Sequence, residues 1–542
     1  SKMKLFAPNL TDFYKTGHIR QYPPETSFVY SNLTCRSDRL ARLLPDFDHK
    51  VVSFGIQGVC KWLLRDAWNR EFFHRPKAEV VDRYKRRMDS SLGAGAVDVS
   101  HIAALHDLGY LPILVKALPE GSRVNIRVPL FTIQNTIPEF YWLSNDLETQ
   151  LSAELWKPST TATVAYEYRR LLERYARETG APLEFVDWQG HDFSPRGMSG
   201  IHDSAQSGAG HLLSFLGTDS IHSIDYLEDY YNAAGTFVGG SVPATEHSVM
   251  CMGGMDDEFE TFRRLIEDVY PSGIVSIVSD TWDFWGVVGL GGFAERLKDK
   301  ILARRPDAMG MAKTVFRPDS GDPVRIICGY RYTDVTSLDA DAVAAARQAG
   351  YDAVRHQGKY FAIDPAAAGT TPKLTPLGEN EAKGSLECLH DIFGGTVTAK
   401  GYKVLHERVG LIYGDSITLE RAQAILAGMK AKGFASNNMV FGIGSFTYQY
   451  CTRDTFGSAV KATYGVVKGV GRPLFKDPKT DGGTKKSAKG LLRVEKEGND
   501  FVLYEDQTPE QEKTGVLRPV FRDGKIENEE NLVTIRGRLK GG

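Results

Sequence analysis

The sequence predicts an α/β fold in which parallel strands form a barrel, and three observations indicate it. Four apolar, β-type runs lie at residues 273–280, 312–323, 410–415 and 438–445, and each ends in Asp or in a Gly-rich turn. Three of these runs are followed by an amphipathic or apolar segment, as in successive βα units. The polar ends would meet at one rim, where α/β folds place their chemistry.

The second run is the most informative. Thr314-Val315-Phe316 ends abruptly in Arg317, and Asp319 and Ser320 follow. A guanidinium can hold a phosphate bidentately, and a carboxylate can accept from a sugar hydroxyl. The alternative is a structural Arg–Asp pair at a strand end. Because all four runs end in this style, we expect a rim that binds a phosphorylated sugar.

The spacing of apolar residues predicts the remaining helices and strands. Alternation over residues 124–130 predicts a half-buried strand, with Pro129 at an edge or end. Residues 141–156, 160–177 and 339–354 look helical, and 256–270 has one apolar face typical of an amphipathic helix. A helix of 419–429 is expected after the third barrel strand.

Bulk properties exclude several classes of protein. The 542 residues predict two or three domains. Hydrophobic content of 42%, charged content of 25% and a formal net charge of -2 give no reason to expect a nucleic-acid or membrane partner. The first residues lack the apolar core of a signal peptide. Six scattered cysteines without a C-x-x-C pair argue against zinc or disulfides and predict a cytoplasmic location.

A second group of polar residues lies between positions 191 and 248. It packs His191, Asp192, Phe193 and Arg196 into six positions, and Gly217-Thr218-Asp219 and residues 241–248 follow. Small residues between repeated polar side chains favour a pocket wall, although a single His or Phe here would more often belong to a core.

With these motifs the chain resembles the nicotinamide phosphoribosyltransferases. The resemblance runs from about residue 8 to about residue 490, in the family's order, except for a longer and poorly matching segment at 324–400. The motifs that carry it are Thr11-Asp12-Phe13-Tyr14-Lys15, Gln21-Tyr22-Pro23-Pro24, His191-Asp192-Phe193, Arg196-Gly197, Gly217-Thr218-Asp219, Ser241-Val242-Pro243-Ala244, Glu246-His247-Ser248, Arg317-Pro318-Asp319-Ser320-Gly321, Thr452-Arg453-Asp454 and Phe475-Lys476-Asp477-Pro478.

The resemblance implies a fold and an activity. The fold is the type II phosphoribosyltransferase fold, with a β-rich domain built from residues 1–155 together with 446–542 and an α/β barrel at 156–445 that carries an insertion at about 324–400. The reaction joins nicotinamide to 5-phosphoribosyl 1-pyrophosphate (PRPP) and releases pyrophosphate, in NAD salvage. Mg²⁺ is the implied cofactor, ATP a coupled co-substrate, and the partner a second copy in a homodimer with shared active sites.

Residue roles follow from the same resemblance. Phe193, and Tyr14 of the partner subunit, would stack on the pyridine ring. Asp219 would accept from the amide N–H, and Arg196 would meet the ring or the amide oxygen. The other implied substrate contacts are Asp12, Ser241 and Ser276, and the catalytic group is His247, Asp280, Arg317 and Asp319. Phosphates would be held by Arg36, Gly414, Asp415, Gly442, Gly444, Ser445, Arg453, Lys461 and Lys476. The metal ligands are not implied.

Two residues carry the finer expectations. His247 resembles the family's phosphorylated histidine, while composition alone would make it a core or a hydrogen-bonded histidine. An ionised Asp219 would accept from an amide and repel a carboxylate. A hydrogen bond to a charged group is worth about 1.5–3 kcal/mol, which predicts at least a tens- to hundreds-fold preference for nicotinamide over nicotinate.

Departures from the family pattern leave alternatives open. Ser445 stands in place of a glycine, and Ala459 in place of a serine near Lys461, which bears on ATP coupling and pyrophosphate affinity. The alternatives are a nicotinate phosphoribosyltransferase and a non-catalytic dimeric nucleotide binder.

Overall fold

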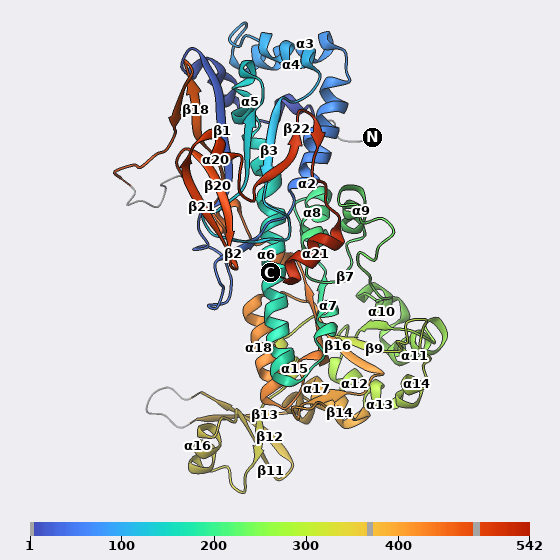
Figure 1. Cartoon of the computed structure of the whole chain (residues 1–542). Coiled ribbons are helices and arrows are strands. Elements are labelled where there is room, and N and C mark those ends of the chain that lie inside the picture. The colour runs from blue at the N-terminus through green and yellow to red at the C-terminus, as the bar shows by residue number, and fades with distance from the viewer. Residues whose placement is uncertain (1–4, 366–371, 481–487, 542) are drawn as a thin grey trace.

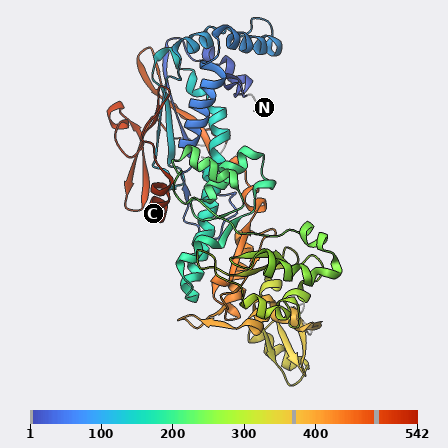
Figure 2. The same cartoon turned by 90° about the vertical axis from the view of Figure 1, so that its right-hand side faces the viewer.

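The computed structural model describes residues 5–365, 372–480 and 488–541. Figure 1 shows an elongated molecule with a β-rich part at the top and an α/β part below, and the long helix α6 (Glu148–Thr179) running between them. Figure 2 shows the same division from the side. Within the described residues, no helix combines the length and apolarity needed to cross a membrane.

The β-rich part is organised around an antiparallel sheet built from both ends of the chain. Its strand order is β19-β18-β1-β5-β3-β22-β23. The bounds are β1 Thr26–Cys35, β3 Ile113–Ala117, β5 Pro129–Asn135, β18 Ser458–Val467, β19 Val470–Pro473, β22 Arg518–Arg522 and β23 Lys525–Ile526. Two ribbons, β2 (Lys50–Val52) with β4 (Arg123–Asn125) and β20 (Leu491–Glu497) with β21 (Asp500–Gln507), complete it. Its helices are α1 His18–Gln21, α2 Ile56–Val59, α3 Lys77–Leu92, α4 Ser100–Leu108, α5 Leu143–Asp146, α20 Pro509–Glu512 and α21 Leu532–Gly541.

The α/β part holds a sheet of six parallel strands in the order β7-β6-β17-β16-β9-β8. These strands are β6 Gly190–Asp192, β7 Gly217–Thr218, β8 Val275–Val278, β9 Thr314–Arg317, β16 Val409–Tyr413 and β17 Met439–Ile443. The surrounding helices are α7 Val186–Gln189, α8 Ile201–His211, α9 Ile221–Tyr230, α10 His247–Gly253, α11 Glu258–Arg264, α12 Phe284–Val288, α13 Phe293–Arg296, α14 Lys298–Leu302, α15 Pro323–Cys328, α17 Glu379–Phe393, α18 Leu419–Ala431 and α19 Ser445–Tyr448.

One short segment joins the two edges of this sheet. Gly240 pairs with Gly217 at the β7 edge, and Ala244 pairs with Ser276 at the β8 edge, both in parallel. The backbone N–H of Ser276 donates to Pro243 at 2.9 Å, and that of Thr245 donates to Ser276 at 2.9 Å. Residues 240–244 therefore close the sheet into the barrel that the sequence predicts.

The insertion forms a lobe of its own at the end of the molecule away from the β-rich part (Figure 1). It contains β10 (Tyr332–Asp334), α16 (Ala340–Gln348), β11 (Ala353–His356), β12 (Lys359–Asp364) and β13 (Lys373–Leu377) around a small separate core. The ribbon β14 (Gly395–Val397) with β15 (Lys403–Leu405) follows α17. Residues 366–371 of the predicted insertion lie outside the described residues.

Some predicted elements differ in detail. The strand expected over 124–130 is broken, because Arg127 adopts a positive φ of 76° between β4 and β5. The helix expected over 339–354 ends at Gln348, and the chain enters β11 at Ala353. The helices expected over 141–156 and 160–177 are for the most part the single helix α6, which continues through Pro158.

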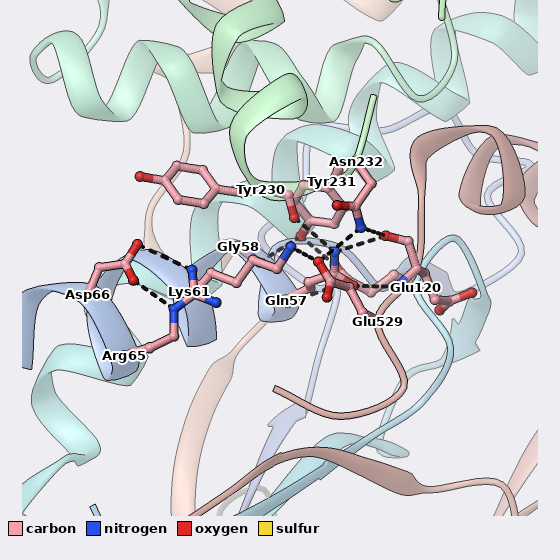
Figure 3. A network of polar contacts seen from close by, with 11 residues as sticks. Gln57, Gly58, Lys61, Arg65, Asp66, Glu120, Tyr230, Tyr231, Asn232 and Glu529 are labelled. Carbon is pink, nitrogen blue, oxygen red and sulfur yellow. Dashed lines mark hydrogen bonds and ion pairs between the residues drawn. The ribbon is translucent and has the colours of Figure 1, made fainter. Parts of the chain in front are cut away.

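A buried polar network joins the β-rich part to the barrel (Figure 3). The carboxylate of Glu120 accepts from the backbone N–H groups of Gly55, Ile56 and Gln57 at 2.5, 3.2 and 3.0 Å, at the start of α2. It also accepts from the hydroxyl of Tyr231, which follows α9, at 2.9 Å. Burial raises the pKa of Glu120 to about 7, against the opposing effect of these donors.

Candidate active site

The rim of the barrel gathers the polar residues that follow its strands. Phe193 follows β6, Asp219 follows β7, His247 follows the closing segment, Asp280 follows β8, and Asp319 follows β9. Gly414 with Asp415 and Gly444 with Ser445 follow β16 and β17. The carboxyl ends of parallel strands meet at one edge, so residues from seven chain segments share a site.

One side of the rim surrounds Asp219. Its Oδ1 accepts from Nε2 of His191 at 2.8 Å and from Oγ of Ser241 at 3.1 Å. Burial alone would raise the pKa of Asp219, but the bond and charge of His191, with smaller help from Ser241 and Arg317, hold that pKa below its usual value. Asp219 is therefore an ionised carboxylate at neutral pH.

The ring of Phe193 lies across two glycines. A Cβ at Gly414 would stand 2.5 and 2.7 Å from two ring carbons of Phe193, and a Cβ at Gly442 would also overlap the ring. The N–H of Phe193 donates to Ile443 at 2.8 Å, which fixes its backbone on β17. These glycines thus make room for an aromatic platform. Whether their N–H groups also bind phosphate stays a prediction.

The opposite side of the rim carries one guanidinium and two carboxylates, which contact one another. Arg317 donates from Nε to Asp319 at 3.3 Å and from a terminal nitrogen to the carbonyl of Thr245 at 2.8 Å. Asp280 accepts from the backbone N–H of Asp319 at 2.9 Å and from the hydroxyl of Ser320. Burial, with repulsion from Asp280, raises the pKa of Asp319, and Arg317 opposes this.

His247 stands next to both carboxylates. Its Nε2 lies 3.8 Å from Oδ1 of Asp280 and 3.9 Å from Oδ2 of Asp319. Its Nδ1 lies 3.0 Å from the hydroxyl of Thr281, so Thr281 orients the imidazole, and the neighbouring Glu246 accepts from Ser248. Ligand atoms of His247, Asp280 and Asp319 all lie within 4.8 Å of one another, as a cation site requires.

Other predicted rim residues are nearby. The side chain of Ser276 is buried in β8, and its hydroxyl has no hydrogen-bond partner among the described residues. Arg196 is exposed on the turn after Phe193. Ser445 packs against Gly197, where a Cβ would overlap its hydroxyl, and a Cβ at Gly444 would meet nothing within 4 Å.

A second predicted group lies in the β-rich part. Burial lowers the pKa of Lys461 on β18, Glu148 opposes this, and the charges of Arg36, Lys476 and Arg453 lower it further. These four cations therefore form one positive cluster. Asp12 accepts from Thr149 at 3.2 Å, and Tyr14 presents a side chain that is 63% exposed.

Sequence reasoning named His191 and the segment with Thr245 as a pocket wall, but it gave no orienting role to any residue and did not single out Thr281. In the structure, His191, Thr245 and Thr281 each hold a predicted site residue through a side chain or a carbonyl. Their spacing in the sequence carries no signal for these pairs, which depend on the strand register. The register pairs His191 with Gly217, two residues before Asp219.

Comparisons with known proteins indicate the family and the fold. Residues 188–525 match the nicotinate phosphoribosyltransferase (NAPRTase) family. A nicotinamide phosphoribosyltransferase of Acinetobacter baylyi is 60% identical over 531 residues, covering 98% of this chain and 96% of the relative. One from Mycoplasma pneumoniae is 33% identical over 498 residues, covering 87% and 92%. The crystal structure of a nicotinate-nucleotide pyrophosphorylase from Pyrococcus furiosus matches with a TM-score of 0.52 and 13% identity, covering 99% and 94%.

The fold and these relatives define a type II phosphoribosyltransferase, an enzyme of the pentosyltransferase class. Within that class, the chain belongs to the nicotinate phosphoribosyltransferase family.

Proposed function

We propose that this enzyme joins nicotinamide to PRPP, giving nicotinamide mononucleotide and pyrophosphate in NAD salvage. The observation that carries the proposal is the ionised Asp219 beside the Phe193 platform. A pyridine ring stacked on Phe193 would present its 3-substituent to a carboxylate, which accepts from an amide N–H and repels a carboxylate. The 60% identical relative, a nicotinamide phosphoribosyltransferase, supports nicotinamide as the base.

The rim residues suit the chemistry of this reaction. The C1–O bond of PRPP breaks, pyrophosphate leaves with the bonding electrons, and the neutral ring nitrogen of nicotinamide forms the new bond to C1. The nucleophile carries no proton, so no general base is required, and positioning and electrostatics do the work. Asp280 and Asp319 would stabilise the positive charge that develops on the ribose, and Arg317 would hold a phosphate.

A divalent cation fits the acidic side of the rim. Oδ1 of Asp280 is buried and has no hydrogen-bond partner among the described residues. Asp280 and Asp319 would hold Mg²⁺ together with substrate oxygens, since this ion prefers oxygen ligands. The ion would neutralise the leaving pyrophosphate. We also propose that ATP turnover couples to synthesis through transient phosphorylation of His247, whose imidazole is half exposed at the rim.

The complete site is proposed to form in a homodimer. The exposed Tyr14 would close over the base on the rim of a second copy, and the cluster of Arg36, Arg453, Lys461 and Lys476 would receive its pyrophosphate. Mixing two inactive variants, Tyr14→Ala and Asp280→Ala, tests this. A mixed dimer with shared sites has one intact site, so about a quarter of wild-type activity should return. Unchanged inactivity would contradict shared sites.

The first test of the reaction uses the pure protein with PRPP, Mg²⁺ and either nicotinamide or nicotinate, with and without ATP. Mononucleotide formation from nicotinamide is the expected result, and stimulation by ATP would support a working His247. Product from nicotinate in preference to nicotinamide would overturn the assignment of the base. Tight binding of nicotinamide mononucleotide without turnover would favour a binding protein.

A further inference from the structure

His191 stands behind Asp219 in a position that no role in the proposed reaction explains. Its imidazole is 12% exposed and packs edge-on against Phe193, with ring centroids 5.1 Å apart. A Cβ on the neighbouring Gly217 would lie 2.8 Å from its Nδ1, so the register partner leaves room for the ring. The imidazole is therefore confined between β7 and the aromatic platform.

The hydrogen bond between the two residues has a fixed direction. A carboxylate only accepts, so Nε2 of His191 carries the proton that is donated to Oδ1 of Asp219 at 2.8 Å. Ser241 donates to the same oxygen. Within the described residues, Oδ2 of Asp219 accepts no hydrogen bond. Two donors thus hold one oxygen, and the other is left for a ligand.

We propose that His191 is a positioning residue for the preference of the amide over the acid, because it holds one oxygen of Asp219 and leaves the other to face the ligand. This inference rests on the proposed function. With this donor in place, Oδ2 of Asp219 faces the 3-substituent of the base, where it accepts from an amide and repels a carboxylate. Without the donor, the carboxylate is held by Ser241 alone, so both the attraction of the amide and the repulsion of the acid become weaker.

The groups around His191 and Asp219 come from several elements. Asp219 faces Nε2 of His191, and Arg317 acts on Asp219 from the far side of the rim. His211 is a buried neighbour, and burial lowers the pKa of His211. Asp192, the next residue along the chain, has one oxygen occupied by the N–H and hydroxyl of Ser194. Among the described residues, the side chains that donate to Asp219 are therefore His191 and Ser241.

The test compares kcat/KM for nicotinamide with kcat/KM for nicotinate, at saturating PRPP and a single pH, in the wild type and in two variants. In His191→Phe, kcat/KM for nicotinamide should fall about tenfold or more, and the ratio of the two values should fall with it, because Asp219 loses a donor. In His191→Gln, whose amide can donate from a similar position, both the value for nicotinamide and the ratio should return to near those of the wild type.

Two further variants serve as controls. Ser241→Ala removes the other donor to Oδ1, so it should weaken nicotinamide use and lower the ratio in the same direction as His191→Phe. His222→Gln removes a histidine that pairs with Ser204 and not with Asp219, and it should leave the ratio unchanged.

The outcomes separate this inference from the proposed function. A wild type that uses nicotinamide, with a folded His191→Phe variant that keeps the wild-type ratio, would overturn the role of His191 and leave the proposed function standing. A wild type without activity on nicotinamide would overturn both. If His191→Phe does not fold, a folded His191→Gln that loses the preference for nicotinamide would also overturn the role of His191.

Discussion

The contact between Phe193 and Gly414 gives a sharp test of where the base binds. In Gly414→Ala, the new Cβ would stand 2.5 Å from Cε2 and 2.7 Å from Cδ2 of Phe193. Ordinary contact between carbon atoms begins near 3.4 Å. The ring must therefore move by about 1 Å, because the backbone of Gly414 is held at the end of β16.

The size of the effect follows from that shift. A misplacement of about 1 Å in a positioning group can cost about a hundredfold in rate, and loss of one aromatic stack costs about 0.5–1.5 kcal/mol. We therefore expect kcat/KM for nicotinamide to fall about ten- to a hundredfold, mainly through KM, while the KM for PRPP changes less. Steady-state kinetics with each substrate varied in turn measures both.

A matched variant isolates the cause. In Gly444→Ala the new Cβ meets nothing within 4 Å, and the N–H group is kept, so we expect near wild-type KM for nicotinamide. Thermal unfolding of both variants reports whether the barrel is intact. Wild-type KM and kcat/KM for nicotinamide in a folded Gly414→Ala would show that the base does not bind on Phe193.

Three further predictions concern other parts of the molecule. Asp219→Asn removes the charge, so the preference for nicotinamide over nicotinate should fall about tenfold or more in competition assays; an unchanged preference would count against Asp219. Arg317→Lys cannot reach both Thr245 and Asp319 as the fork does, so kcat/KM for PRPP should fall about tenfold, and an equal value would remove Arg317 from the phosphate site. The pKa of Glu120 rises on folding from 4.5 to about 7, so between these values the folded state binds more protons and the free energy of unfolding falls as pH rises, by up to about 3 kcal/mol. Glu120→Gln should remove this part of the pH dependence, measured by urea unfolding at about pH 5 and about pH 8, and an unchanged slope would refute it.

The barrel strands with clear apolar runs were predictable, and the shortest ones were not. Strands β8, β9, β16 and β17 each contain four or five residues that follow a β pattern. Strands β6 and β7 have three and two residues, and residues 240–244 join the sheet through isolated pairs. Such short segments show no period, so the sequence indicated a pocket wall there without indicating that it completes the barrel.

Helix α6 shows tertiary packing overriding a local signal. Pro158 removes one backbone donor and disfavours a continuous helix. The helix nevertheless continues, because residues both before and after Pro158 are buried between the barrel and the β-rich part. The hydroxyl of Ser159 donates to Val52 on β2, and Pro158 packs on Gly55. Contacts with distant residues therefore decide this element, and no local pattern reports them.

Side chains alternate between the two faces of each barrel strand. This alternation explains why the same short segments both stabilise the fold and form the site. Phe316, Leu411 and Phe441 are fully buried in the apolar core. Successive side chains of a strand point to opposite faces, and at the next position Arg317 reaches Asp319 and Gly442 lies under Phe193. The face that packs in the core must be large and apolar to stabilise the barrel, whereas the opposite face near the rim must be small or charged to admit substrates. A shift of one residue in register would exchange the two sets, so the strand pairing that stabilises the barrel also determines the chemistry of its rim.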